Sequence, residues 1–418
     1  MASNDIMVSM KPTVVVVGGG ASGLAAAVTA ARAGAKVVLL EKGKALGRKI
    51  LASGGGRCNL FHRDPRPERY HGGDPAFVRT VLAAFGAADA RAFFEGLGLL
   101  LMEEPDGRVF PRCGKSRAVV DVLQSAANEL GVDVRLETGV AGFERAAADF
   151  LVRLDDGQAV GAGRVLLCCG APSYPQLGGS RSGLELARAL GHSFVEPTPA
   201  LVPLLVREGW IRKLEGTRVE AVLRAEARGR VLAQARGELL FTAYGLSGPA
   251  ALDVSREALR ALAAGPVACA VDLFPETPED AFLGSLRERA ARFPARSLKG
   301  LLVGMLPESV PDVFLERNGF DRHAAVSSLE KGRLEALGRA LKGWRFELAG
   351  ARPWEDAMVS AGGVRLEEVR PETLESRKVP GLHLAGELLD VDGDSGGFNL
   401  HFAWATGILA ARAAVPSR

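Results

Sequence analysis

Cysteine is scarce in this sequence, and no cysteine stands in the spacing of a metal site or a redox pair. The five cysteines occupy positions 58, 113, 168, 169 and 269 of 418 residues. None forms a CxxC or zinc-type pattern, so no metal site is expected. The adjacent pair at 168 and 169 also fits poorly with a structural disulfide. This usage is typical of a reducing compartment.

Long apolar runs are also missing. No segment approaches the roughly 20 apolar residues of a membrane-spanning helix, and the polar start MASNDIMVSMK is not a signal peptide. We therefore expect a cytoplasmic protein with no membrane partner, whose first ten residues form a loose tail. A mild net charge of +3 permits an anionic partner without arguing for one.

Length and composition set the scale of the fold. A chain of 418 residues and 44.0 kDa is too long for one ordinary core, so two or three domains are expected. Apolar residues make up 47% and charged residues 24% of the chain, as in soluble globular proteins.

The amino-terminal segment TVVVVGGGASGLAAAVTAARAGAKVVLLEKG has the pattern of a strand, a glycine turn, a helix and a second strand. Residues 13–17 form a β-branched run, which is typical of a strand buried on both faces. Residues 21–33 are rich in alanine and favour a helix, which Gly34 would end. Residues 36–40 then predict a second strand.

The glycines in this turn follow the spacing G-x-G-x-x-G that is used to bind dinucleotides. Gly18 permits the tight turn, Gly20 lets the backbone approach a pyrophosphate, and Gly23 allows close packing of the helix. Glu41, about twenty residues on, predicts a carboxylate that binds a ribose 2′-hydroxyl, which favours NAD or FAD over a phosphorylated nucleotide. Cofactor contacts are expected from Gly18, Gly20, Ala21, Ser22, Gly23, Glu41 and Lys42.

A second glycine-rich loop, GKALGRKILASGGGRCN, follows directly. Its cations flank a run of glycines at 54–56, so the loop can lie along an extended cofactor and meet phosphate or flavin edges. The alternative is a surface loop with some basic residues. The residues assigned to the cofactor are Arg48, Lys49, Gly55, Gly56, Arg57, Cys58 and Asn59.

Near the other end, GLHLAGELLDVDGDSGGFNLHFAWATG reads as a strand, an acidic turn, a glycine pair and a helix. FAD is too long for one βαβ unit, so a second loop must hold the ribityl chain and the flavin ring, with the helix start near the flavin N1 and C2 carbonyl. We therefore favour FAD, bound non-covalently. The expected contacts are Gly386, Glu387, Asp392, Gly396, Gly397, Phe398 and Asn399, together with Val140 and Gly170 from strands at 131–140 and 164–171.

These motifs together resemble a bacterial family of FAD-dependent oxidoreductases that includes a proposed bile-acid enone reductase and ribosomal RNA dihydrouridine synthases. The likeness is carried by GGGASGLAAA, EKGKALGRKILASGGGRCN, GRVFPRCGKSRAVVDVL, TPALVPL, YGLSGPAALDVS, SAGGVRLEEVRPETLESRKVPGLHLAGELLDVDG and GGFNLHFAWATG. It implies an α/β fold of the two-dinucleotide-binding-domain flavoprotein type, in which a Rossmann-like FAD domain is interrupted by a β-barrel-like domain and a small helical domain.

The sequence pattern agrees with that organisation. The FAD domain is expected at 1–195 and 356–418, and short strand-like runs alternate with turns over 196–275. Helical periodicity follows over 276–340, and residues 341–355 predict a strand that returns to the insert.

Only one dinucleotide fingerprint is present, and the CxxxxC pair of disulfide reductases is absent. NAD(P)H is therefore expected as a transient electron donor rather than the ligand of a second domain. The resemblance implies that the acceptor is a polarised C=C bond, in an enone or a uracil ring. The rival class is a flavin-binding redox sensor or scaffold without turnover.

Reducing such a bond requires a proton donor as well as a hydride. The ionisable candidates are Lys49, Cys58, Tyr174, Glu387 and His401. Of these, Lys49 and Cys58 are our catalytic candidates, although Lys49 also suits a phosphate or flavin contact. Cys58 equally suits a small buried packing residue, and His401, in an apolar helical segment, more often reads as a core histidine.

A basic stretch within the expected β-rich domain raises RNA as a substrate. A basic sheet face there could follow a phosphate backbone, and the alternative is an arginine-rich face in water. A small molecule and RNA therefore both stay open as the substrate, and the oligomeric state is not predicted. The stretch contains Arg207, Arg212, Lys213, Arg218, Arg224, Arg228, Arg230 and Arg236, against Glu208, Glu215, Glu220 and Glu226.

Overall fold

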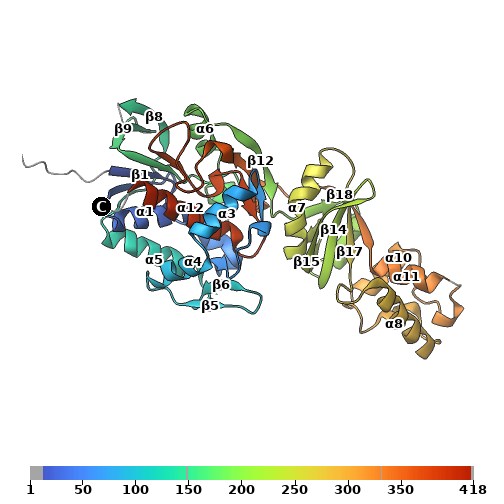
Figure 1. The fold of residues 1–418 in the computed structure, drawn as a ribbon. Helices are drawn as coiled ribbons and strands as arrows, with labels where there is room; N and C mark the ends of the chain where they lie inside the picture. The colour runs from blue at the N-terminus through green and yellow to red at the C-terminus, as the bar shows by residue number, and fades with distance from the viewer. Residues whose placement is uncertain (1–12, 147–148, 331, 416–418) are drawn as a thin grey trace, which may run out of the picture. The chain divides into compact units, whose positions relative to one another are not determined.

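The computed structural model describes residues 13–146, 149–330 and 332–415, and the chain divides into two compact units (Figure 1). The first unit comprises residues 1–198 and 359–418, and the inserted unit comprises residues 199–358. The expected amino-terminal tail lies outside the described residues.

A parallel sheet of five strands forms the centre of the first unit, in the order β20-β11-β1-β2-β7. All four neighbouring pairs run parallel. The valines of β1 are buried on both faces, as a continuous β-branched run predicts for a central parallel strand. The bounds are β1 Thr13–Val17, β2 Lys36–Leu40, β7 Asp133–Arg135, β11 Arg164–Leu167 and β20 Leu382–Leu384.

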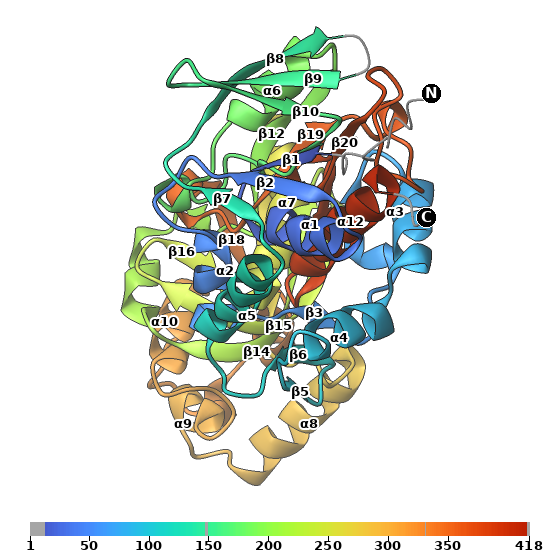
Figure 2. The same ribbon diagram turned by 90° about the vertical axis from the view of Figure 1, so that its left-hand side faces the viewer.

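Two helices from distant parts of the chain pack together beside this sheet. They are α1 (Ala21–Arg32) and α12 (Phe398–Ala414), and Figures 1 and 2 draw them side by side in blue and red. The helices approach closely because Gly407 has no side chain: a Cβ there would lie 2.2 Å from the carbonyl oxygen of Ser22. Together with β20, α12 confirms that a Rossmann-type domain is built from both regions of the sequence.

Smaller elements surround this core. β21 pairs antiparallel with β4, β12 pairs with β19, and two further three-stranded sheets have the orders β10-β9-β8 and β3-β6-β5. The strands are β3 Phe61–His62, β4 Tyr70–Gly72, β5 Leu101–Glu103, β6 Arg108–Pro111, β8 Val140–Ala146, β9 Asp149–Leu154, β10 Ala159–Ala162, β12 Phe194–Ala200, β19 Val359–Val364 and β21 Val391–Gly393. The helices are α2 Arg48–Ala52, α3 Pro75–Ala84, α4 Ala87–Glu95, α5 Ser116–Glu129 and α6 Ser182–Ala189, with 3₁₀ turns η1 Ser53–Gly56, η2 Pro67–Arg69, η3 Pro175–Leu177, η7 Leu366–Glu368 and η8 Gly386–Leu388.

The inserted unit is a closed six-stranded barrel with helices, in the strand order β13-β16-β15-β14-β17-β18. Its last strand, β18, pairs with both β17 and β13 and so closes the barrel. The strands are β13 Leu204–Val206, β14 Arg218–Ala227, β15 Arg230–Thr242, β16 Gly245–Ser247, β17 Ala268–Asp272 and β18 Trp344–Ala351. The helices are α7 Pro249–Leu262, α8 Glu279–Arg292, α9 Leu298–Leu302, α10 Val310–Arg317 and α11 Arg333–Leu341, with 3₁₀ turns η4 Gly209–Leu214, η5 Val326–Ser328 and η6 Trp354–Asp356.

The barrel and the helices of the insert share one hydrophobic core, although the sequence suggested two separate domains. Phe314 of α10 packs edge-on against Trp344 of β18, with ring centroids 5.1 Å apart, and Phe346 lies 5.0 Å from the same tryptophan. The residues expected as a β-rich part, a helical part and a return strand therefore form one compact unit. Within the described part of the chain, no helix combines the length and apolar character needed to cross a membrane.

Candidate functional site

The glycine turn between β1 and α1 has the geometry that its spacing predicts. Gly18 has a φ of +106°, and a Cβ there would lie 2.4 Å from the carbonyl oxygen of Cys168. A Cβ on Gly23 would lie 1.8 Å from the carbonyl oxygen of Gly18, so the helix can approach the turn only through glycine. At Gly20, by contrast, a Cβ would have no neighbour within 4 Å. The backbone at the start of α1 is thus open to a ligand, and no side chain caps it.

Glu41 follows β2 and lies beside this turn. Its two carboxylate oxygens accept hydrogen bonds from the backbone N–H groups of Gly19, at 2.7 Å, and Gly43, at 2.6 Å. These bonds fix the carboxylate, and each oxygen keeps a second lone pair. The side chain is therefore held where it could still accept from a ribose hydroxyl. Lys42 instead donates to the hydroxyl of Ser180, at 2.6 Å.

The second glycine loop contains a run of left-handed backbone. Gly54, Gly55 and Gly56 have φ values of +56°, +63° and +85°. Three successive residues in this conformation require glycine. Cβ atoms at Gly55 and Gly56 would meet no neighbour within 4 Å, so this stretch too presents bare backbone to its surroundings.

Two arginines that the sequence assigned to the cofactor already have protein partners. Arg57 pairs with Glu104 at 2.7 Å, and its guanidinium lies 4.1 Å from the centre of the Phe110 ring. Arg48 donates to the carbonyl oxygen of Gln176 at 2.5 Å. Arg57 is therefore directed toward β6, and a phosphate contact would require it to leave Glu104.

Cys58 and His401 are both buried. Cys58 is fully buried with a φ of +60°, and burial raises the pKa of its thiol to about 12 despite a hydrogen bond from Ser53. These observations favour the packing role over the catalytic one. Burial lowers the pKa of His401 to about 4, and its Nε2 donates to the carbonyl oxygen of Phe85 at 3.1 Å. His401 is a neutral core histidine.

The start of α12 has no side-chain cap and lies beside one unpartnered polar atom. Gly396 and Gly397 have φ values of +122° and +101°, and a Cβ on Gly397 would lie 2.7 Å from Oδ1 of Asn59. Asn59 is 9% exposed, and its Oδ1 has no hydrogen-bond partner among the described residues. No side chain caps the helix and no acidic residue lies in its first turn. A buried amide oxygen without a partner is costly unless a ligand donates to it.

The rest of this loop is braced by its own side chains. Asn399 accepts from the N–H of Gly393 at 2.8 Å and donates to the carbonyl oxygen of the same residue at 2.7 Å. The ring of Phe398 stacks on His62, with centroids 5.0 Å apart. Asp392 is 3% exposed. The side-chain amide of Asn399 closes the loop, and its contact with the cofactor stays a prediction.

Three further predicted contacts are glycines or backbone positions. Gly170 has a φ of +68°, and a Cβ there would meet nothing within 4 Å. Gly386 lies so close to α1 that a Cβ would be 2.5 Å from Oγ of Ser22. Val140 begins β8 and is partly buried. Gly170 therefore resembles Gly20 in its openness, whereas Gly386 serves the packing of the turn after β20.

A lysine and a glutamate separated by 338 residues form an ion pair at the carboxyl ends of β11 and β20. Lys49 Nζ contacts Glu387 Oε2 at 2.5 Å. Two serines complete this group, which we call the lysine–glutamate cluster (Lys49, Ser173, Ser360 and Glu387). Lys49 also donates to Ser173 Oγ at 2.6 Å, and Glu387 Oε1 accepts from Ser173 Oγ at 2.6 Å and from the N–H of Ser360 at 2.9 Å. The sequence indicated Lys49 and Glu387 as separate candidates, but neither their pairing nor the two serines.

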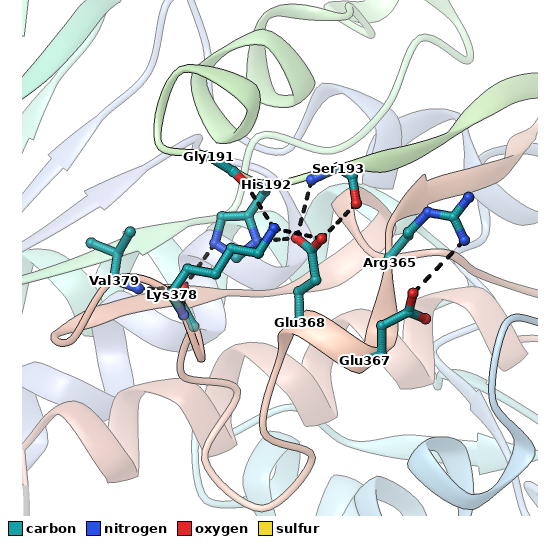
Figure 3. Close-up of polar contacts among 9 residues, drawn as sticks. Gly191, His192, Ser193, Arg365, Glu367, Glu368, Lys378 and Val379 are labelled. Carbon is teal, nitrogen blue, oxygen red and sulfur yellow. Dashed lines mark hydrogen bonds and ion pairs between the residues drawn. The ribbon is translucent and has the colours of Figure 1, made fainter.

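A second polar group, the histidine–glutamate cluster, consists of His192, Ser193, Glu368, Ser376 and Lys378. Figure 3 labels these residues except Ser376. Glu368 accepts from His192 Nδ1, from the N–H and hydroxyl of Ser193, and from Lys378 Nζ. His192 Nε2 lies 2.8 Å from Ser376 Oγ, which also accepts from the N–H groups of Lys378 and Val379. Sequence reasoning missed this cluster because its members are single polar residues with no common spacing.

Burial and hydrogen bonding act oppositely on the pKa values of this cluster. Burial alone would raise the pKa of Glu368, but hydrogen bonds from Lys378, Ser193 and His192 lower it to about 2. Burial lowers the pKa of His192, against the opposing hydrogen bond to Glu368. The ring is therefore neutral, with its proton on Nδ1 toward Glu368, and Ser376 donates to Nε2.

The basic stretch of the barrel is largely neutralised by acids. Arg212, Arg228 and Arg230 make no ion pair among the described residues. The pairs in this stretch join Arg207 to Glu347, Lys213 to Glu316, Arg218 to Glu238, Arg224 to Asp272, and Arg236 to Glu220 and Glu276. Over the described residues, no group of three or more His, Cys, Asp and Glu side chains is placed to hold a metal ion.

Comparison with known proteins gives a match along nearly the whole chain. Residues 12–413 match the family described as "HI0933-like protein Rossmann domain". The chain is 38% identical over 402 residues to the 3-dehydro-bile acid delta(4,6)-reductase of Clostridium scindens, covering 96% of this chain and 98% of that protein. It is 32% identical over 396 residues to the ribosomal RNA dihydrouridine synthase of Escherichia coli, covering 94% and 95%. A solved 3-ketosteroid delta1-dehydrogenase from Sterolibacterium denitrificans has a TM-score of 0.49 at 13% identity, covering 98% and 100%.

Proposed function

The chain belongs to the HI0933-like family of Rossmann-type flavoproteins, and from this membership we propose that it uses electrons from NAD(P)H to reduce a polarised C=C bond. The cofactor is FAD, which supplies hydride-transfer chemistry when bound. The observation that carries the proposal is the pair of helix starts without a side-chain cap, at Gly20 and Gly397, whose helices α1 and α12 come from distant parts of the chain and pack together beside one parallel sheet. A protein that held its nucleotide with one glycine turn alone would not need the second helix start.

The residues present fit FAD. The bare backbone at Gly20 and the uncapped first turn of α1 suit a pyrophosphate. Glu41 suits a ribose hydroxyl, because its carboxylate is fixed beside that turn. The unpartnered Oδ1 of Asn59 next to the start of α12 suits the pyrimidine edge of a flavin, which carries both a donor and acceptors. These residues bind and orient the cofactor, and other residues determine which acceptor is reduced.

The electron donor is proposed to dock transiently. The sequence contains one dinucleotide fingerprint, and its turn is the one assigned to FAD. NADH or NADPH would therefore bind only while it delivers its electrons. This part of the proposal is tested by mixing the FAD-loaded protein with each nucleotide and following the loss of flavin absorbance.

For the acceptor we propose a small conjugated carbonyl compound of the enone type. The relative from Clostridium scindens, which matches over nearly its whole length, is named as a reductase of a bile acid. The extensive ion pairing in the basic stretch of the barrel also weighs against an RNA-binding face, because paired arginines have less charge to offer phosphates.

A uracil ring in RNA is the second candidate acceptor, favoured by the relative from Escherichia coli. Replacing the unpaired Arg212, together with Lys213, by glutamate tests it. If RNA is the substrate, the double variant should bind RNA more weakly and with a flatter dependence on salt, while FAD content stays unchanged. Equal RNA affinity and salt dependence in both proteins would argue against this surface.

The central experiment is purification followed by reduction and reoxidation. Acid or heat should release a yellow compound that chromatographs as FAD, and Gly20→Asp should abolish its binding by placing a carboxylate against the pyrophosphate. NAD(P)H should then bleach the bound flavin, and an enone should restore its colour. Bleaching without acceptor-dependent reoxidation would favour a redox sensor, and a colourless protein that takes up no FAD would refute the proposal.

A further inference from the structure

The lysine–glutamate cluster occupies the edge of the sheet where ligands bind in open α/β folds. Ser173 follows β11 and Glu387 follows β20, and these two strands are neighbours in the parallel sheet. Crevices at the carboxyl ends of such strands are the usual binding sites of this architecture. Lys49 comes from α2, beside the glycine loop, and reaches the same edge.

Lys49 is held in place but keeps one donor. An ammonium group has three N–H donors, and two of them are directed at Glu387 and Ser173. No third acceptor contacts it among the described residues, and its side chain is 29% exposed. Glu387 balances its charge, which allows the ammonium to be half-buried without being isolated.

The two serines hold this ion pair in one arrangement. Ser173 is fully buried, accepts from Lys49 and donates to Glu387. Ser360 is also fully buried: its N–H donates to Glu387, and its hydroxyl accepts from the N–H of Ser173 at 3.2 Å. The carboxylate therefore has three donors, and the lysine has little freedom to turn away.

Three of the other ionisable candidates are less suited to donate a hydrogen bond to a ligand. Cys58 and His401 are fully buried, and the Glu387 carboxylate accepts hydrogen bonds and has no hydrogen of its own to donate. Lys49 alone among these four combines exposure, charge and an unused donor.

We infer that Lys49 donates its third N–H to the carbonyl oxygen of the acceptor, and that Ser173 and Ser360 are positioning residues that act through Glu387. This inference rests on the proposed function. When the hydride that NAD(P)H has supplied by way of the bound cofactor adds to the far carbon of an enone, the π electrons of the C=C bond move toward the carbonyl and charge develops on its oxygen. A fixed ammonium donor stabilises that charge. Lys49 neither gains nor loses a proton in this step, and water returns a proton to the product.

The test uses 4-nitrophenol as a stable mimic of the charged oxygen, and it requires no turnover. The FAD-loaded protein is titrated with 4-nitrophenol at a pH below the pKa of the free phenol, and phenolate absorbance reports binding of the ionised form. Wild-type protein should bind the phenolate. Lys49→Met should bind it about 10- to 100-fold more weakly, the loss expected for one charge-assisted hydrogen bond. Lys49→Arg should retain part of the affinity.

Two further variants separate positioning from general damage. Ser173→Ala should weaken phenolate binding about 2- to 10-fold. Its FAD content should stay unchanged, and its free energy of unfolding should fall by no more than the loss of a single hydrogen bond. Lys44→Met, at an exposed lysine of the same loop, is the matched control and should behave as wild type.

The outcomes test the roles of Lys49 and of Ser173 separately. Absent phenolate binding in wild type, or equal binding in wild type and Lys49→Met, would overturn the role of Lys49. Unchanged binding in Ser173→Ala would overturn the positioning role. Phenolate binding through Lys49 in a protein that reduces no enone would reject the proposed function while keeping this donor site.

Discussion

The two polar clusters of the first unit use the same residue types at opposite ends of one short strand. Glu387 follows the carboxyl end of β20, whereas the N–H of Ser376 donates to the carbonyl oxygen of Leu382, at the beginning of that strand. Each cluster contains a glutamate, a lysine and serine hydroxyls. Lys378, like Lys49, contacts two acceptors, so the number of unused donors does not separate them.

The two clusters differ in their position on the sheet and in how fully the hydrogen-bonding groups of their glutamates are paired. Glu368 accepts from four donors and faces a buried, neutral histidine, an arrangement that joins the segments around His192, Glu368 and Ser376 (Figure 3). The lysine–glutamate cluster lies instead at the edge where α/β sheets bind ligands. Under the proposed function, the ion pair at the ligand-binding edge of the sheet has a chemical role, whereas the same residue types at the other end of β20 join segments of the chain.

The largest expected effect is on stability and comes from Glu368→Ala. This change leaves Lys378, His192 and Ser193 without their common acceptor, and the loss of these hydrogen bonds should lower the free energy of unfolding by about 2–4 kcal/mol. Urea denaturation measures it. Glu372→Ala, at an exposed glutamate of the same segment, is the control and should change stability by less than about 0.5 kcal/mol. An equally small effect of Glu368→Ala would show that the cluster does not hold the fold together.

Acid should weaken the fold in two stages. Because the pKa of His401 is lowered from 6.5 to about 4, the folded state favours its neutral form, and the corresponding stability, about 3 kcal/mol, is lost as pH falls from 6.5 toward 4. His192, whose pKa is also lowered, acts in the same direction. The pKa of Glu368 is lowered from 4.5 to about 2, so its contribution, also about 3 kcal/mol, is lost between these values.

Unfolding midpoints measured across this pH range check both stages. Glu368→Gln should flatten the dependence below pH 4.5 and leave the loss caused by His401 between 6.5 and 4 in place. The pKa of His192 should fall further, because the carboxylate that opposes the effect of burial is gone. A variant whose profile stays parallel to that of the wild type would contradict the assignment of the lower stage to Glu368.

The smallest expected effect on stability comes from Glu387→Ala. Its ion pair with Lys49 is partly exposed, with side-chain exposures of 29% and 19%, so the loss should be about 1–2 kcal/mol. The same variant should impair phenolate binding, because Lys49 loses its anchor. If its stability falls as far as that of Glu368→Ala, the division between a structural and a ligand-binding cluster is wrong.

Local patterns in the sequence predicted the frame of the first unit. The strands at 13–17 and 36–40 and the glycine turn are confirmed because buried β-branched runs and glycine spacing are local signals. The helix beginning after Gly397 is confirmed for the same reason. Resemblance to a family supplied the barrel, whereas the joining of the two chain regions was expected from the length of FAD and from the second glycine-rich turn near Gly397.

The remaining parts depend on which side chains meet in space. Nothing near Arg57 indicated that Glu104 and Phe110 would take its guanidinium, and nothing near Ser173 or Ser360 indicated a meeting with Glu387. The shared core of the barrel and the helices was missed because Phe314 and Trp344 lie in segments of different periodicity. Contacts of this kind leave no recognisable spacing in the sequence.

The divided sheet has a consequence for how the protein is made. β20 emerges from the ribosome more than 200 residues after its neighbour β11, a delay of roughly 10–40 s at about 5–20 residues per second. During that interval the inserted unit, which is continuous in the chain, can already fold, while β11 keeps a bare edge and α1 lacks the cover of α12. The half of the FAD site at the start of α12 is complete only after this interval. Newly made chains therefore pass through a stage without the complete cofactor site and with exposed apolar surface, which chaperones would have to protect from aggregation.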